Sequence, residues 1–321
     1  SHGYTVDEKN GPMMALAERA DQEFALSVIP GAYLCDALPI CGYVPDWTGV
    51  RFKKDAKRFR KTMESLRDGA YEDVKAQVMK GTAKASFAQS LVERNLNPTP
   101  EEELIHKWAS VGLYGAGTDT TFSAVESYFV TMSLHPEIQE RAYMELCNVV
   151  GSTRLPQFND RAELPYINAI LQEIHRWNPV TPLALPHQLT QDDSYRGIRI
   201  PAGSILFANS WLGNTPRSCS ASNPFTFNPD RFLSPSEDSK LNPDPRRYNF
   251  GFGRRVCPGQ YLADDALFIA IVTTLAVFHI APMNKNKTAK HVEYTSAIIS
   301  HPKEVDCILT PRSQEAISLL Q

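Results

Sequence analysis

Residues 250–259 read FGFGRRVCPG and place a single cysteine, Cys257, in a loop rich in glycine and arginine. The glycines let the backbone turn tightly and approach something flat or bulky, which an ordinary loop rarely needs. The two arginines and the N-terminus of a helix expected from Pro258 put positive potential near the sulfur, which favours a thiolate. The loop therefore predicts a sulfur that serves as a metal ligand or as a nucleophile.

The role of Cys257 has three alternatives. Most free cysteines pack as small hydrophobic residues. A nucleophilic cysteine needs a histidine base, and residues 250–259 contain none, although a histidine distant in sequence can serve. A thiolate with no second cysteine at metal-ligand spacing suits haem iron, because the porphyrin supplies the other four donors. We take the haem ligand as the leading hypothesis and keep the buried residue and the nucleophile as alternatives.

Length and composition restrict the class of protein. The 321 residues, 42% of them apolar, can build a core, and we expect one domain over residues 1–321. The 33 basic and 36 acidic residues are scattered along the chain, which argues against a nucleic-acid partner. The six cysteines show no CxxC spacing and are too sparse for a disulfide scaffold. They therefore predict reduced thiols and disfavour a structural zinc site.

Membrane segments are not evident in the sequence. Residues 1–14 lack the basic and apolar regions of a signal peptide, so the chain is expected to be soluble or to lack its true beginning. Residues 266–284 carry no charge, but Asp264 and Asp265 precede them and Pro282 lies near their end. We therefore expect a helix buried in protein rather than a membrane span.

Apolar periodicity predicts a largely helical chain. Helices are expected at residues 12–28, 50–79, 100–134, 137–151 and 164–178. The third should be about 30 residues and roughly 45 Å long. It starts with Thr99 as N-cap, Pro100 and three glutamates. Residues 29–49 form a Pro/Gly-punctuated connection, which is packing material or, alternatively, a lid or a segment that dips into a membrane surface.

The later part of the chain has a mixed character. Residues 180–211 alternate between apolar and polar positions, with turns at YRG and PAG, and predict short antiparallel strands. Residues 213–249 are irregular and rich in Pro, Asn and Ser, as is usual for a long loop that supports a site. Residues 292–313 predict a final hairpin. The expected fold class is mainly α with small antiparallel sheets.

The cysteine loop carries a specific resemblance. Phe250, Gly253, Arg255, Cys257 and Gly259 occupy every fixed position of the FxxGxRxCxG pattern of the cytochrome P450 haem-thiolate monooxygenases. Five such residues in this order are expected by chance in well under about one in a thousand chains of this length. The chain resembles this family, and its fungal members in particular. The resemblance implies haem b (iron protoporphyrin IX) on Cys257, a long central helix and a helix bundle around the haem.

A second motif, GAGTDTT at residues 115–121, lies in the expected long helix. Ala116 and Gly117 precede Thr120 by four and three residues, so two small residues and a hydroxyl share one helix face and leave a gap for a small ligand. The alternative is a helix-packing notch with a solvated Asp119. In the family this gap holds O2 above the haem. The resemblance thus implies that Asp119 and Thr120 deliver protons.

A third motif, EIHR, places Glu173 and Arg176 at i, i+3. Alone it means little, because E-x-x-R occurs by chance about once in a chain of this size, and an exposed pair is worth under about 1 kcal/mol. Its position between the notch and the cysteine loop, together with Arg231 in NPDRF, resembles the charged triad of the family. We expect a structural role, in which a buried carboxylate shared by two guanidiniums clamps residues 213–249 beneath the cysteine loop.

Ligand and substrate contacts are implied by the resemblance as well. His187 aligns with the residue that contacts one haem propionate, although an ordinary strand histidine is the alternative, and Arg255 would bind the other propionate. Residues 181–185 and 295–299 resemble two substrate-contact segments. Both are apolar, which suits a hydrophobic small molecule.

The chain departs from the family pattern in two places, and one apparent match to it is fortuitous. The family's long N-terminal portion, with its membrane anchor, is absent, so we expect a domain that is incomplete at its N-terminus. Trp47 and Arg51 match a WxxxR motif of that portion, but Pro45 and Gly49 break any helix there, so we interpret the match as fortuitous. Residues 213–224 lack the usual His-Asp-Pro pattern.

The resemblance implies a haem-dependent monooxygenase that inserts one oxygen atom from O2 into a hydrophobic small molecule. Electrons would come from NADPH through an NADPH-cytochrome reductase, and fungal secondary metabolism is the expected context. The full-length protein would lie on the cytosolic face of the endoplasmic reticulum membrane, attached only through the absent N-terminus or residues 29–49. The alternative is a non-catalytic haem-binding or structural remnant of such an enzyme.

Overall fold

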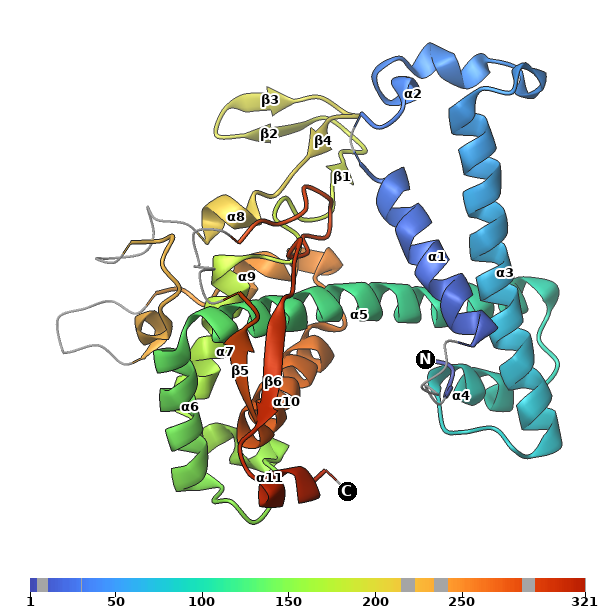
Figure 1. The fold of residues 1–321 in the computed structure, drawn as a ribbon. Helices are drawn as coiled ribbons and strands as arrows, with labels where there is room; N and C mark the ends of the chain where they lie inside the picture. The colour runs from blue at the N-terminus through green and yellow to red at the C-terminus, as the bar shows by residue number, and fades with distance from the viewer. Residues whose placement is uncertain (5–10, 30, 215–222, 234–241, 285–291, 321) are drawn as a thin grey trace. The chain divides into compact units, whose positions relative to one another are not determined.

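Helices contain most of the residues that the computed structural model describes (Figure 1). The described residues are 1–4, 11–29, 31–214, 223–233, 242–284 and 292–320. The chain divides into two compact units, Ser1–Asp119 and Thr120–Gln321. The mainly α class with small antiparallel sheets is confirmed. That residues 1–321 form one domain stays a prediction.

The first unit is built from helices in its described part. They are α1 (Pro12–Ser27), α2 (Leu34–Ala37), α3 (Arg51–Lys80), α4 (Phe87–Arg94) and the first part of α5 (Pro100–Leu134), with 3-10 turns at Pro39–Tyr43 and Asp46–Thr48. α1 packs on α3 and α5 through Ala17, Ala20, Leu66 and Val111. The helices predicted at 12–28 and 50–79 are thus confirmed.

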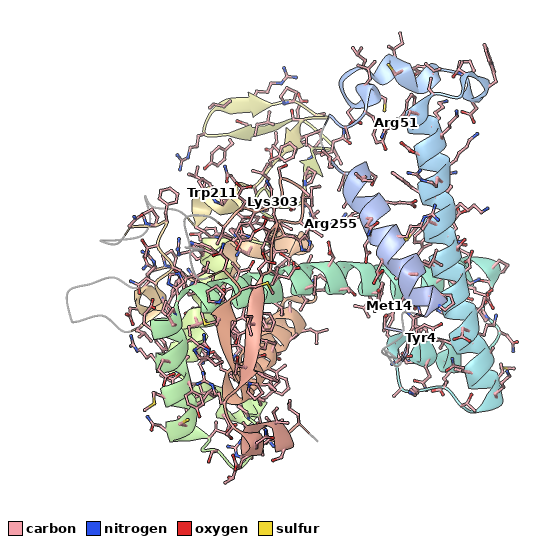
Figure 2. The ribbon with its side chains drawn as sticks, in the orientation of Figure 1. Tyr4, Met14, Arg51, Trp211, Arg255 and Lys303 are labelled. Carbon is pink, nitrogen blue, oxygen red and sulfur yellow. The ribbon has the colours of Figure 1, made fainter. Side chains whose placement is uncertain are left out.

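The connection between α1 and α3 ends in a left-handed glycine. Gly49 has a φ of 66°, and α3 begins two residues later at Arg51 (Figure 2). Trp47 lies in a separate 3-10 turn. Trp47 and Arg51 therefore do not share a helix, as we expected from Pro45 and Gly49.

A capping box starts α5. The Thr99 hydroxyl accepts a hydrogen bond from the Glu102 N–H (3.3 Å), and the Glu102 carboxylate accepts one from the Thr99 N–H (2.8 Å). The helix ends at Leu134, before His135 and Pro136, which confirms the predicted bounds of 100–134, and its 35 residues make it longer than the approximate length of 30 residues. α5 runs from the first unit into the second.

The core of the second unit forms where α5, α6 (Pro136–Val149), α7 (Pro165–Trp177) and α10 (Gln260–Val277) meet. By length and hydropathy, α10 is the described helix that could cross a membrane. Its residues Leu267, Phe268, Ile271 and Leu275 are at most 1% exposed and belong to this core. As predicted, it packs inside the protein, but the helix ends at Val277.

Within the described residues the strands form three antiparallel pairs. These are β1 (His187–Gln188) with β4 (Ile205–Leu206), β2 (Asp193–Tyr195) with β3 (Ile198–Ile200), and β5 (Phe278–Pro282) with β6 (Cys307–Pro311). The β2–β3 turn uses Arg196 and Gly197 with φ of 50° and 80°, as a tight type I′ hairpin requires. The strands predicted within 180–211 are confirmed.

The final hairpin predicted at 292–313 is wrong. β6 pairs with β5, which continues directly from α10, and residues 292–306 contribute one isolated bridge between Tyr294 and Pro302. The reason is that residues 278–282 extend an apolar run whose periodicity does not distinguish strand from buried helix.

Short elements complete the second unit. They are α8 (Ser210–Gly213), α9 (Arg246–Asn249), α11 (Gln314–Ser318) and 3-10 turns at Phe158–Glu163, Pro229–Phe232 and Gly253–Arg255. α9 directly precedes the cysteine loop and is bound to α7 by the hydrogen bond from Asn249 to the His175 carbonyl oxygen, and the 3-10 turn at Gly253–Arg255 lies within the loop.

Candidate functional site

The cysteine loop, residues 250–259, is a tight turn in front of α10. The Cys257 N–H donates to the Phe250 carbonyl oxygen at 2.7 Å and closes the turn. Gly251 has a φ of 80°, and a Cβ there would lie 3.3 Å from the Arg255 carbonyl oxygen. A side chain at position 251 would therefore meet both backbone strain and crowding.

The other two glycines of the motif lie on either side of the cysteine. Gly253 opens the 3-10 turn with a φ of 57°, and Gly259 is the residue before α10. A Cβ on Gly259 would lie 3.9 Å from the Cys257 sulfur, at contact distance. Glycine therefore leaves room beside the thiol, which is free and half-buried.

The donors around Cys257 fit a haem better than a bare metal ion. Among the described residues no group of three or more His, Cys, Asp or Glu side chains could hold a metal ion. A single sulfur suffices for an iron whose other four donors come from a porphyrin. The exposed Phe252 and Val256 give the loop an apolar surface suited to a flat ring.

The two expected propionate ligands are both accessible. Arg255 ends the 3-10 turn (Figure 2), and its guanidinium has no ion pair with the described residues. His187 is exposed in β1, where it pairs with Leu206 of β4. Each side chain can reach a carboxylate of a ligand. Their role as propionate ligands stays a prediction.

The structure brings Glu173, Arg176 and Arg231 together. Arg176 of α7 binds the Glu173 carboxylate through Nε and Nη2, at 2.6 and 2.8 Å, and Arg231 binds it through Nε at 3.3 Å. The Asn228 N–H donates to the same carboxylate at 2.7 Å. The side chains are 0–3% exposed, so these charges satisfy one another out of contact with water.

The two arginines also bind the irregular segment after α8. Arg176 donates to the Pro224 carbonyl oxygen at 2.9 Å, and Arg231 donates to the carbonyl oxygens of Thr226, at 3.0 Å, and Asn223. A guanidinium offers five donors in a fixed plane, which lets it satisfy backbone carbonyls and a carboxylate at once. Residues 223–231 are therefore clamped onto α7; residues 215–222, in the segment that departs from the family pattern, lie outside the described residues.

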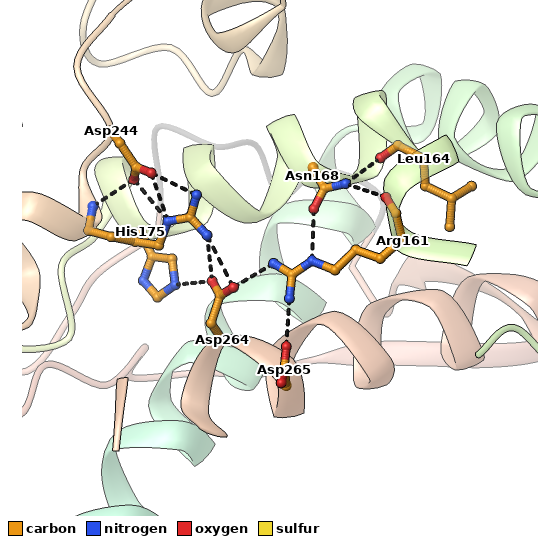
Figure 3. Close-up of polar contacts among 8 residues, drawn as sticks. Arg161, Leu164, Asn168, His175, Asp244, Asp264 and Asp265 are labelled. Atoms are coloured by element: carbon orange, nitrogen blue, oxygen red, sulfur yellow. Dashed lines mark hydrogen bonds and ion pairs between the residues drawn. The ribbon is translucent and has the colours of Figure 1, made fainter. Parts of the chain in front are cut away.

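A second, partly buried charge network joins the 3-10 turn Phe158–Glu163, α9 and α10 (Figure 3). Asp264 of α10 accepts hydrogen bonds from Arg161 and from Arg246, the latter at 3.1 Å to both oxygens. Arg246 also binds Asp244, at 2.7–2.9 Å, and Arg161 binds Asp265 at 2.7 Å. The beginning of α10, directly after the cysteine loop, is thus fixed by paired charges.

Sequence reasoning missed this network. Asp264 and Asp265 were interpreted only as charges that precede an apolar segment. A carboxylate in the second turn of a helix that is otherwise apolar was the available signal, because a buried charge requires partners. The partners Arg161 and Arg246 lie 103 and 18 residues away along the chain, so the sequence could not identify them.

The notch motif lies within the continuous helix α5. Ala116, Gly117 and Asp119 belong to the first unit, and Thr120 begins the second. In the first unit, Asp21 of α1 is half-buried; burial, with the charge of Asp119 in addition, raises the pKa of its carboxyl to about 6. Asp119 therefore lies in the electrostatic range of a second carboxyl group.

The two expected substrate segments converge on α5 in the second unit. The Ser123 hydroxyl donates to the Ser300 carbonyl oxygen at 2.7 Å, and the Ser300 N–H donates to the Val180 carbonyl oxygen at 2.8 Å. Residues 181–185 and 295–299 therefore both border a point one helical turn after Thr120.

The chain is similar to known proteins along its whole length. Residues 21–309 match the family model of Cytochrome P450. Cytochrome P450 monooxygenase 208 of Postia placenta is 41% identical over 100% of this chain and 62% of its own length. Cytochrome P450 monooxygenase claR of Ampulloclitocybe clavipes is 40% identical over 100% of this chain and 60% of its own length. Cytochrome P450 monooxygenase ppsD of Aspergillus oryzae is 35% identical over 100% of this chain and 62% of its own length. The chain thus spans about 60% of the length of these relatives.

Proposed function

Because the chain belongs to the cytochrome P450 family, we propose that it forms the haem-binding part of a monooxygenase. Haem-dependent monooxygenation is the activity of this family. For this protein we propose insertion of one oxygen atom from O2 into a hydrophobic small molecule, with haem b as the prosthetic group. The observation that carries the proposal is the cysteine loop, in which the half-buried Cys257 lies between glycines that leave room beside its sulfur.

The chain's own residues would hold the haem at three points. Cys257 would bind the iron, and Arg255 and His187 would bind the propionates through charge-assisted hydrogen bonds. The bound iron would supply the activation of O2. The Glu173–Arg176–Arg231 cluster would take no part in the chemistry, because its charges are buried against one another and against backbone.

Proton delivery is assigned to the notch. The net reaction converts a C–H bond to C–OH and releases the second oxygen atom as water, which consumes two electrons and two protons. Asp119 would hold a proton and pass it to the Thr120 hydroxyl, which can donate and accept at once. Ala116 and Gly117 would leave space for the small gas molecule on the same helix face.

Electrons and membrane attachment are also part of the proposal. An NADPH-cytochrome reductase would dock near the exposed Arg254, which supplies positive charge on the cysteine loop, while Arg255 is assigned to a propionate. Residues 29–49 would contact the endoplasmic reticulum membrane. Ile40, Tyr43 and Trp47 are 73–87% exposed there, an unusual exposure for apolar side chains.

The reduced, CO-bound Soret spectrum tests the proposal. The parent protein should show the thiolate-type band, and Cys257→Ser should lose it. Cys147→Ser is the matched control, since Cys147 is another free, half-buried cysteine, on α6, and this variant should keep the band. A parent protein that binds no haem, or a band that survives Cys257→Ser, would refute the assignment.

Turnover distinguishes the monooxygenase from a non-catalytic remnant. NADPH consumption with a reductase should rise when a hydrophobic substrate is added, and Asp119→Asn should lower this rate by about 100-fold or more. Bound haem without substrate-stimulated consumption would instead favour the remnant.

A further inference from the structure

His175 is a buried histidine that the proposed chemistry does not use. It lies on α7 between Glu173 and Arg176 and is 6% exposed. Burial, with a smaller contribution from Arg246, lowers the pKa of its imidazole to about 4. Its ring is therefore neutral at physiological pH, and among the described residues its Nε2 has no hydrogen-bond partner.

Asp264 lies close to this nitrogen but makes no hydrogen bond with it; Figure 3 marks the pair, which is an ion pair only if the imidazole is protonated. The Asp264 carboxylate oxygen lies 3.9 Å from Nε2, beyond hydrogen-bond distance (Figure 3). Asp264 is already satisfied by the guanidiniums of Arg161 and Arg246. Nε2 of His175 thus makes no hydrogen bond within the described residues, and the contact that the ring makes with the cysteine loop is one of packing.

The ring of His175 contacts the first residue of the cysteine loop. Its centroid lies 5.5 Å from that of Phe250, with the planes at 65°, an edge-on geometry that aromatic pairs favour. The Phe250 carbonyl oxygen accepts the hydrogen bond from the Cys257 N–H. The His175 carbonyl oxygen accepts one from the Asn249 side chain at 2.7 Å, so the residue before the loop and the first residue of the loop both contact His175.

We propose that His175 is a positioning residue for Cys257. The edge of its ring fixes Phe250, and the Phe250 carbonyl oxygen fixes the backbone N–H of the residue that binds the iron. The Asp264 network forms the rigid wall against which the ring rests. This inference rests on the proposed function for the identity of the iron ligand, but the contact itself exists without haem.

The test compares His175→Ala with His175→Phe. Alanine removes the ring, whereas phenylalanine keeps it and removes both nitrogens. In the haem-loaded protein, we expect His175→Ala to convert part of the thiolate-type CO band to the band of a protonated or displaced sulfur. The reduction potential should shift as well. His175→Phe should keep both signals, because the edge contact with Phe250 is retained.

His135 provides the matched control. It is also a histidine whose buried Nε2 has no described partner, and its ring stacks on Phe227 at 5.5 Å. His135→Ala should lower the melting temperature in the same way as His175→Ala but leave the CO band and the potential unchanged. Equal spectral changes in both alanine variants, or a His175→Phe variant that behaves like His175→Ala, would overturn the proposal.

A second measurement covers a variant that fails to load haem. In the unloaded full chain, amide hydrogen exchange of the peptide that contains residues 250–257 should be about two- to tenfold faster in His175→Ala than in the parent or in His135→Ala. Unchanged exchange would refute the positioning role. Hydrogen exchange can be measured without iron. It would therefore distinguish a failure of the positioning role of His175 from a failure of the assignment of Cys257 as the haem ligand.

Discussion

Replacing Glu173 with glutamine should be among the most destabilising single changes in the second unit. Glutamine has nearly the same shape but no charge, so two buried guanidiniums, those of Arg176 and Arg231, would lose their counter-ion. Removing one partner of a buried ion pair costs about 3–5 kcal/mol. That is a large share of the roughly 5–15 kcal/mol that stabilises a typical domain. For a unit of this size it corresponds to a melting temperature lower by about 6–20 °C.

Thermal unfolding followed by circular dichroism measures this change, with Glu145→Gln as the control. Glu145 is a half-buried carboxylate that accepts hydrogen bonds from the N–H groups of Tyr166 and Ile167, at 2.9 and 3.0 Å, at the start of the same helix. It binds no guanidinium in the described residues, so its loss should cost about 1 kcal/mol. A Glu173→Gln variant that melts no lower than Glu145→Gln would show that the buried charges are not the source of stability.

Two further predictions concern individual positions. Asp21→Asn should raise the melting temperature at about pH 7.5 and leave it unchanged below about pH 4. Burial and the charge of Asp119 raise the pKa of Asp21 to about 6 in the folded protein, from about 3.8 in the unfolded chain. The Asp21 charge therefore begins to oppose folding above about pH 4 and does so with its whole effect above about pH 6. An equal increase in melting temperature at both pH values would contradict this. Gly251→Ala should lower the free energy of unfolding, measured by chemical denaturation, by about 1–2 kcal/mol, because φ is 80° and the Arg255 carbonyl oxygen lies 3.3 Å from the new Cβ. An unchanged denaturation midpoint would contradict that.

Local signals identified most of the helices. Thr99 and Glu102 marked the start of α5 because a capping box is formed by residues three apart, and the Arg196–Gly197 turn joined β2 to β3 because two left-handed residues suit a hairpin. Such features depend on neighbours in sequence, so the sequence suffices to predict them. The pairing of β5 with β6 depends on which distant strand reaches the end of α10, and local periodicity contains no information on this.

The candidate site also contains parts that local sequence motifs predicted and parts that they did not. The glycines and the cysteine of residues 250–259 were predicted from one short motif, and the Glu173–Arg176 pair from i, i+3 spacing on one helix. The Asp264 network was not predicted, since its partners Arg161 and Arg246 come from two separate elements. Which charged residues pair across a long stretch of sequence depends on which of them are buried together in the folded chain. Sequence spacing contains no information on this.

The order of residues on α7 explains how an irregular segment and a tight loop can both be held in place. Glu173 and Arg176 are three apart and share one helix face, which binds residues 223–231. His175 is two residues from Glu173, about 200° around the helix, and faces Phe250 and α10 instead. One rigid helix thus carries the clamp for residues 223–231 on one side and the support for the cysteine loop on the other. A change on either face should therefore leave the contacts of the opposite face intact, as long as α7 itself remains folded.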